Sequence, residues 1–227
     1  MSNLFLDIET TGLPVDYFGL IMDTSNWPRV LQMGMVIKNR HGGTMYEKEF
    51  LIKPDGWKVA ATEIHGITQE EADRHGVGIL VALAELSKWA HVCDVIICHN
   101  VDFDLPVVQA EYYRYSLPHP YNGKRIQCTQ KQTTEILKIR KKQNGFNQSA
   151  YKWPSLKELA AYCKVKWEGE EHTALADAEV CAKCYYIIKS LHPAAFSETY
   201  SYRHLKETIG ETVVVKGMRK SYIRPCR

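Results

Sequence analysis

The 227-residue sequence contains no long hydrophobic run, no internal repeat and no low-complexity segment. No apolar stretch approaches the roughly 18 residues that a membrane helix requires, and no basic-then-apolar signal segment opens the chain. We therefore expect a cytoplasmic protein without a membrane partner. The seven cysteines are an odd number without a secretion signal, which indicates reduced thiols rather than a disulfide framework.

The sequence also has no strong excess of either charge, with a formal net charge of +3 at pH 7. That balance permits a nucleic-acid partner but does not argue for one. The length suits one domain, which we place at residues 1–191, followed by a basic appendage at 192–227. Residues 212–227 carry five basic residues and no acid. This fits either an arm that contacts nucleic acid or a solvated tail.

Hydrophobic periodicity predicts an α/β protein. Between the first two strands, residues 14–30 are expected to form a long loop, and loops of this length are usually functional or mobile. Ser155 and Glu158 have the spacing of a capping box. The predicted strands span residues 3–9, 31–38, 44–53, 95–98 and 125–128, and the main predicted helices span 78–91, 105–115, 129–140, 155–163 and 173–191.

Asp7 and Glu9 lie in the strongly apolar first strand, after the run Leu4-Phe5-Leu6. Because side chains alternate along a strand, the two acids point to the same side. Burying two unpaired carboxylates costs several kcal/mol each, on the order of the values for buried charges. A divalent metal between them is one interpretation, and a solvated edge strand is the other.

Two further acidic positions occur later in the chain. Asp102 and Asp104 both follow the predicted buried strand 95–98, and α/β folds bind ligands beyond the carboxyl ends of such strands. Asp104 also fits the N-cap of the next helix, which is a purely structural role. Asp177 falls on an inward helix face, where an acid needs a partner, because its spacing continues an apolar stripe of Cys181, Cys184 and Ile188.

Four converging carboxylates and one histidine have the composition of a two-metal site for phosphodiester hydrolysis. Hard divalent cations prefer oxygen ligands, and a pair of them activates water and stabilises the leaving oxygen. His172, five residues before Asp177, titrates near neutrality and can take a proton from water.

The chain resembles the DEDDh 3′→5′ exonuclease superfamily, which includes the proofreading subunit of bacterial replicative polymerase, ribonuclease T and oligoribonuclease. Three motifs carry the resemblance, in the family's order, and a segment often seen in the family lies between the first two. The motifs are Asp7-Ile8-Glu9-Thr10-Thr11-Gly12-Leu13, His99-Asn100-Val101-Asp102-Phe103-Asp104 and His172-Thr173-Ala174-Leu175-Ala176-Asp177-Ala178, and the segment is Glu63-Ile64-His65-Gly66-Ile67-Thr68.

The resemblance implies a ribonuclease H-like mixed five-stranded sheet flanked by helices. Strands 1–3 would form an antiparallel meander, and strands 4 and 5 would run parallel to strand 1. It also implies two Mg²⁺ or Mn²⁺ ions, with Asp7 bridging both, and His172 as the general base. The family pattern selects Asp104 over Asp102. The implied metal ligands, which are also catalytic, are Asp7, Glu9, Asp104 and Asp177.

The resemblance further implies a set of substrate contacts. The first motif would lie against the 3′-terminal nucleotide, with Leu13 wedging the base. His65 would border the same nucleotide, and Asn100 and Phe103 would support the second motif. The implied substrate-binding residues are therefore Thr10, Thr11, Gly12, Leu13, His65, Asn100 and Phe103.

We expect a metal-dependent enzyme that releases nucleoside 5′-monophosphates from 3′ ends, with single-stranded DNA as substrate. The alternative is the same chemistry on RNA ends or short oligoribonucleotides, and the 2′-hydroxyl distinguishes the two. A non-catalytic nucleic-acid-binding module would lack a ligand, whereas all five positions are filled. A proofreading subunit is another possibility, in which the appendage docks on a replication polymerase.

Overall fold

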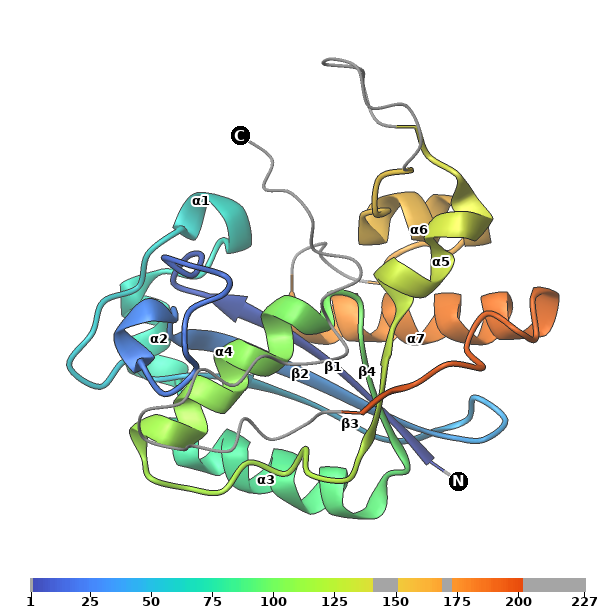
Figure 1. Cartoon of the computed structure of the whole chain (residues 1–227). Helices are drawn as coiled ribbons and strands as arrows, with labels where there is room; N and C mark the ends of the chain where they lie inside the picture. The colour runs from blue at the N-terminus through green and yellow to red at the C-terminus, as the bar shows by residue number, and fades with distance from the viewer. Residues whose placement is uncertain (1, 141–150, 169–172, 202–227) are drawn as a thin grey trace.

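The computed structural model describes residues 2–140, 151–168 and 173–201, and it is built on one mixed sheet (Figure 1). The strand order is β3-β2-β1-β4-β5-β6. The first three strands form an antiparallel meander, β4 and β5 run parallel to β1, and β6 runs antiparallel to β5. The strands are β1 Ser2–Thr10, β2 Val30–Asn39, β3 Thr44–Leu51, β4 Val95–Cys98, β5 Arg125–Cys128 and β6 Tyr200–Ser201.

This sheet confirms the predicted five-stranded ribonuclease H-like arrangement and adds β6 at its edge. The added strand comes from the segment that we assigned to the appendage. Phe196, just before it, is buried beside α7, and its carbonyl accepts a hydrogen bond of 2.7 Å from the Gln127 amide. The first residues after the predicted boundary therefore pack on the sheet. Residues 202–227 lie outside the described residues.

Helices cover both faces of the sheet (Figure 1). Leu4, Leu6 and Ile8 of β1 face the α3 and α4 side, whereas Phe5 faces α6 and α7. In the part of the chain that the structure describes, no helix has both the length and the apolar character needed to cross a membrane. The helices are η1 Thr24–Asn26, α1 Thr62–His65, α2 Gln69–His75, α3 Ile79–Val92, α4 Val101–Arg114, α5 Thr129–Leu137, α6 Leu156–Cys163 and α7 Ala174–Leu191.

The start of α4 differs from the prediction. We expected the helix to begin near residue 105 with Asp104 as its N-cap, but it begins at Val101 with Asn100 in the cap position. The Asn100 carbonyl accepts hydrogen bonds from the N–H groups of Phe103 and Asp104. The helix therefore starts before Pro106, and Asp104 is a buried residue of its first turn. At α6, in contrast, the predicted capping box of Ser155 and Glu158 is present.

The long loop between β1 and β2 is held by a buried ion-pair network. The Glu111 side chain is 1% exposed, and its Oε1 atom lies 2.9 Å from Arg29 Nε and 3.0 Å from Arg114 Nη1. Arg114 also donates hydrogen bonds of 2.7 and 2.6 Å to the carbonyls of Thr24 and Trp27. The loop that follows the first motif is thus fixed to α4 by charged groups.

We predict that Glu111→Gln lowers the free energy of unfolding by about 3 kcal/mol, because it leaves two partly buried cations without their shared anion. Equilibrium urea unfolding measures this change. Glu70→Gln is the matched control, since Glu70 pairs with Arg74 on the surface of α2 with both side chains largely exposed. The control should change stability by less than about 0.5 kcal/mol. Equal effects of the two substitutions would contradict the role of the network.

Candidate active site

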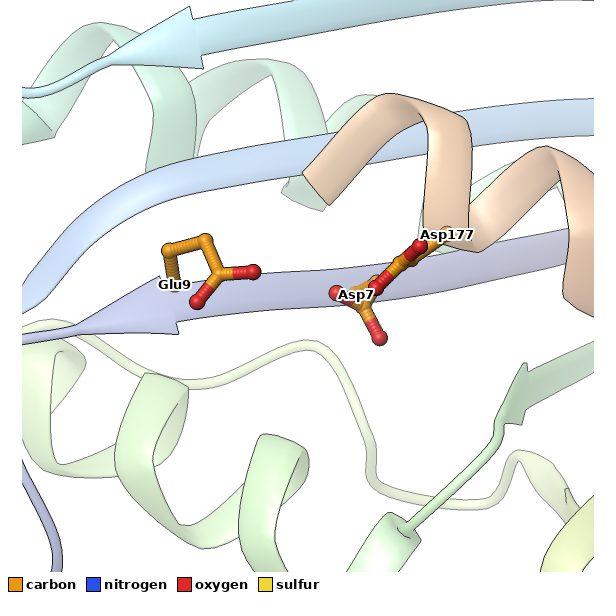
Figure 2. Close-up of side chains that lie close together, drawn as sticks. All are labelled: Asp7, Glu9 and Asp177. Carbon is orange, nitrogen blue, oxygen red and sulfur yellow. The ribbon is translucent and has the colours of Figure 1, made fainter. Parts of the chain in front are cut away.

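Three carboxylates meet on the α7 face of the sheet (Figure 2). Asp7 and Glu9 extend from β1, and Asp177 extends from the first turn of α7. Oxygen atoms of the three side chains lie within 4.8 Å of one another. The two strand residues share the face of Phe5, whose ring packs 5.4 Å from that of Tyr185 on α7. The structure therefore brings together three of the four acids that we singled out in the sequence.

The N-terminal turn of α7 is fixed to the sheet by hydrogen bonds from its own amides. The first N–H groups of a helix have no partner within the helix. Here the Ala174 N–H donates to Gln32 Oε1 at 2.8 Å, and the Leu175 N–H donates to Glu49 Oε2 at 3.0 Å. Gln32 is on β2 and Glu49 is on β3. Side chains of the sheet thus satisfy the helix terminus and hold Asp177 over β1.

Gly34 allows this close approach. It lies directly opposite Asp7 in the β1–β2 ladder. A Cβ atom at this position would lie 2.2 Å from the carbonyl carbon of Ala174 and 2.3 Å from the backbone nitrogen of Leu175. Backbone atoms cannot move aside as a flexible side chain does. Any larger residue at position 34 therefore lifts α7 away from the strand that carries Asp7.

We predict that Gly34→Ala lowers the free energy of unfolding by about 3 kcal/mol, near the upper end for an overpacked site. Gly78→Ala is the matched control, because a Cβ at Gly78 meets no atom within 4 Å. The control should lower the free energy of unfolding by less than about 1 kcal/mol. Urea unfolding of both variants tests this, and a Gly34 variant as stable as the control would show that the helix does not depend on the glycine.

Trp167 orients the Asp177 carboxylate. Its indole N–H donates to Asp177 Oδ1 over 2.6 Å. The ring itself packs against the core cluster of α6 and α7. One oxygen of Asp177 is therefore directed by a residue that lies on neither β1 nor α7.

Asp104 is buried, and its charge interacts with those of Asp7 and Glu9. Hydrogen bonding with main-chain groups of Asn100, Asp104 and Ile8 lowers the pKa of its carboxyl, against the rise from burial. Strand β4 pairs with β1 as far as Phe5, and Ile8 lies beyond this pairing. In contrast, Asp102 forms an ion pair with Lys131.

The acids raise one another's pKa values. Burial raises the pKa of Asp7 well above its usual range, and the charges of Asp104, Asp177 and Glu9 raise it further. Burial, with a smaller contribution from Glu9, also raises the pKa of Asp104. Removing like charges from water without a counter-ion is unfavourable. The donor set is entirely oxygen, so the residues fit a hard divalent cation such as Mg²⁺.

The pKa of Glu9 gives a pH prediction. Burial and the charges of Asp177 and Glu49 raise this pKa from 4.5 to about 7. The folded state thus binds a proton more tightly than the unfolded state between these pH values. Stability of the metal-free protein should therefore fall as pH rises through this window.

Urea unfolding in EDTA across this pH range measures the fall. Glu9→Gln should flatten the dependence, and excess Mg²⁺ at pH 8 should restore stability to the wild-type protein. The explanation fails if the Glu9→Gln variant and the wild-type protein lose stability with pH to the same extent.

The turn after β1 is fixed by its own hydrogen bonds. Thr10 Oγ1 donates to the Gly12 carbonyl at 2.7 Å, and the Thr11 N–H donates to the Arg29 carbonyl at 3.0 Å. Gly12 has φ of +147°, which side-chain-bearing residues rarely adopt. Leu13 is 72% exposed beyond this turn. The turn thus presents an apolar side chain at the carboxyl end of β1.

The remaining predicted positions differ in their surroundings. His65 is buried, with Nε2 2.9 Å from the Ala60 carbonyl and Nδ1 accepting from the Ile67 N–H at 3.1 Å. Asn100 is the N-cap of α4, and Phe103 packs partly buried against the α3–α4 core. Their contacts with a nucleotide stay predictions. His172 lies outside the described residues, and its role as general base stays a prediction as well.

Sequence reasoning missed Gln32, Gly34, Glu49 and Trp167. Gln32 and Glu49 lie on strands that we predicted, but their partners are amides of a helix more than a hundred residues away. A glycine inside a strand signals close approach of another backbone, so Gly34 could have been found. Nothing in the sequence pattern connects Trp167 with Asp177.

The fold and the acidic cluster are those expected of a ribonuclease H-like nuclease, and comparison with known proteins specifies the family. The exonuclease family model RNase_T matches residues 4–185. The chain belongs to this exonuclease family, which confirms that the resemblance carried by the sequence motifs is to exonucleases. This chain is 32% identical to a PolC-type DNA polymerase III of Mycoplasma pneumoniae over 116 residues. The match covers 50% of this chain and 7% of that polymerase.

Solved structures share the fold. A zinc-bound complex of Escherichia coli exonuclease I with single-stranded DNA superposes with a TM-score of 0.68 at 20% identity, over 86% of this chain and 42% of that one. The nuclease domain of 3′hExo, a DEDDh family member bound to rAMP, superposes with a TM-score of 0.63 at 13% identity, over 84% of this chain and 92% of that one. The chain thus spans less than half of exonuclease I.

Proposed function

We propose that this protein is a metal-dependent 3′→5′ exonuclease that releases nucleoside 5′-monophosphates from single-stranded DNA. The observation that carries the proposal is the cluster of Asp7, Glu9 and Asp177 oxygens within 4.8 Å. Carboxylates held this close without a cation repel one another. Hydrogen bonds from Trp167 and from the first amides of α7 nevertheless keep Asp177 in the cluster. Such an arrangement suits metal-assisted phosphodiester hydrolysis.

Asp7, Glu9, Asp104 and Asp177 would hold two Mg²⁺ or Mn²⁺ ions. When bound, such ions lower the pKa of water and neutralise charge on the phosphate oxygens. The chain's contribution is to position these ligands in advance. Trp167 orients Asp177, and main-chain groups of β1 and α4 form hydrogen bonds with Asp104. His172 would accept the proton of the attacking water as general base.

The direction of attack rests on the turn after β1. In the proposal, Thr10, Thr11 and Gly12 meet the 3′-terminal sugar, and exposed Leu13 stacks on the terminal base. The buried network around Glu111 supports this arrangement, because it holds the loop that returns to β2. A terminal nucleotide stopped by this turn would place its scissile phosphate near the acids. His65, Asn100 and Phe103 would border or support the same nucleotide.

Similar structures support DNA as the substrate and keep RNA as a second candidate. Exonuclease I was solved with a dA16 oligonucleotide and with a dT13 oligonucleotide. The 3′hExo domain was solved with rAMP, a ribonucleotide. The two substrate classes differ at the 2′-hydroxyl, which the Thr10–Leu13 turn would approach.

A replication polymerase is the proposed protein partner. The similarity to PolC-type DNA polymerase III supports it, although the match covers 7% of that protein. We also propose that residues 192–227 act as the docking arm. Capture of a replicative polymerase by the full chain, and its loss after removal of residues 202–227, which lie beyond β6, would support this role. Equal capture by both forms would contradict it.

Digestion of matched 3′-labelled and 5′-labelled DNA and RNA oligomers with Mg²⁺ tests the proposed activity. We predict that a 3′ label is released at once as a mononucleotide, that a 5′ label moves into progressively shorter fragments, and that DNA is cut faster than RNA. Asp7→Asn should lower the rate at least about 10³-fold, because a lost metal ligand removes several kcal/mol of transition-state stabilisation.

Asp102→Asn is the matched control. It removes a carboxylate two residues from Asp104 that pairs with Lys131, and its effect on rate should be less than about tenfold. Circular dichroism should show both variants folded. Full activity of Asp7→Asn would refute the mechanism, and faster cutting of RNA would favour the second candidate.

A further inference from the structure

A second charged site lies at the other end of the sheet. A pocket of about 150 Å³ opens between the starts of β1, β4 and β5 and the last turns of α7. Asn3 lines it, and Asn3 precedes Asp7 by four residues, or about 13 Å along a strand. Figure 1 shows this N-terminal end of β1 well away from the first turn of α7, which carries Asp177. The pocket is therefore separate from the acidic cluster.

Three cationic side chains converge on this pocket, namely Arg40, Arg125 and Lys189. No carboxylate is among the described residues that line it. Within the described part of the chain, neither Arg125 nor Lys189 forms an ion pair with an acid. Arg40 Nε donates to the neighbouring His41 Nε2 at 2.8 Å, and Arg40 forms no ion pair with an acid among the residues that the structure describes. Like charges gathered without a counter-ion favour the binding of an anion.

Gln127 and Tyr185 give the pocket a polar wall, beside the apolar side chains of Val95 and Phe196. Gln127 is 4% exposed. Its amide nitrogen donates to the Phe196 carbonyl at 2.7 Å, and its amide oxygen accepts from the Tyr185 hydroxyl at 2.9 Å. Lys189 Nζ lies 5.2 Å from the centre of the Tyr185 ring. Gln127, Tyr185 and Lys189 are thus connected by side-chain contacts, and Arg40 and Arg125 complete the charged part of the lining.

We propose that this pocket binds the phosphate group of a nucleotide or of a nucleic-acid backbone. Two guanidinium forks and an ammonium match the tetrahedral oxyanion, because arginine binds phosphate oxygens in pairs. The pocket volume of about 150 Å³ is several times the roughly 10–15 Å³ that one water molecule requires, so the pocket has room for a group larger than water. The site does not depend on the proposed nuclease activity, because none of its side chains belongs to the acidic cluster.

Inorganic phosphate is the first probe, titrated calorimetrically into the full chain at low salt with EDTA present. We expect saturable binding of one phosphate per chain. The double variant Arg125→Gln/Lys189→Gln should weaken it at least about tenfold, since it removes two charged donors. Arg74→Gln/Lys88→Gln is the matched control, because it makes the same change in net charge on α2 and α3.

Both pairs are exposed on the surface, so both double variants should unfold in urea at nearly the wild-type midpoint. Absence of saturable binding to the wild-type chain would overturn the proposal. Equal loss of phosphate affinity in the pocket variant and the control would also overturn the proposal, because the loss would then follow from the change in net charge alone.

Two further titrations identify the source of the phosphate. A nucleoside 5′-monophosphate and a single-stranded 12-mer are each added to the same variants in EDTA. If the pocket takes a free nucleotide, only the monophosphate loses affinity in the pocket variant relative to the control. If it takes a backbone, the 12-mer loses affinity. A loss in either titration supports the site, whereas no loss in both titrations contradicts it.

Discussion

The structure depends on holding like charges together. Asp7, Glu9 and Asp177 repel one another, and their partial burial strengthens the repulsion because water screens it less. Side chains that no fold held together would relieve this repulsion by moving apart or by taking up protons. The fold prevents separation by fixing the first turn of α7 to β2 and β3. The acidic cluster is therefore a property of the helix docking as much as of the acids themselves.

Two physical features allow the first turn of α7 to dock on the sheet. Gln32 and Glu49 supply acceptors for helix amides that would otherwise have no partner, and Gly34 removes the one Cβ that would block the approach. Glu49 has a double effect, because its charge also raises the pKa of Glu9. The same residue thus stabilises the helix terminus and increases the need for a cation. This coupling connects the packing of the sheet with the chemistry of the site.

Much of the fold was predictable because it follows from local periodicity. The alternation around Asp7 and Glu9 and the helix stripe containing Asp177 placed these acids on inward faces, and the structure has them there. The start of α4 was not predictable, because Pro106 suggested a later start than the cap formed by Asn100. Trp167 and Gln32 were missed for another reason. Their roles depend on contacts between distant segments, which neither spacing nor composition encodes.

Binding of Mn²⁺ tests the central claim, that the clustered carboxylates form a cation site, most directly. Electron paramagnetic resonance at pH 8 counts the bound ions for the wild-type chain, Asp177→Asn and the surface control Asp73→Asn. The account predicts a pair of ions on the wild-type chain and the control, and weaker or fewer bound ions on Asp177→Asn. A wild-type chain that binds no Mn²⁺, or an Asp177 variant that binds it as the wild-type chain does, would contradict the account.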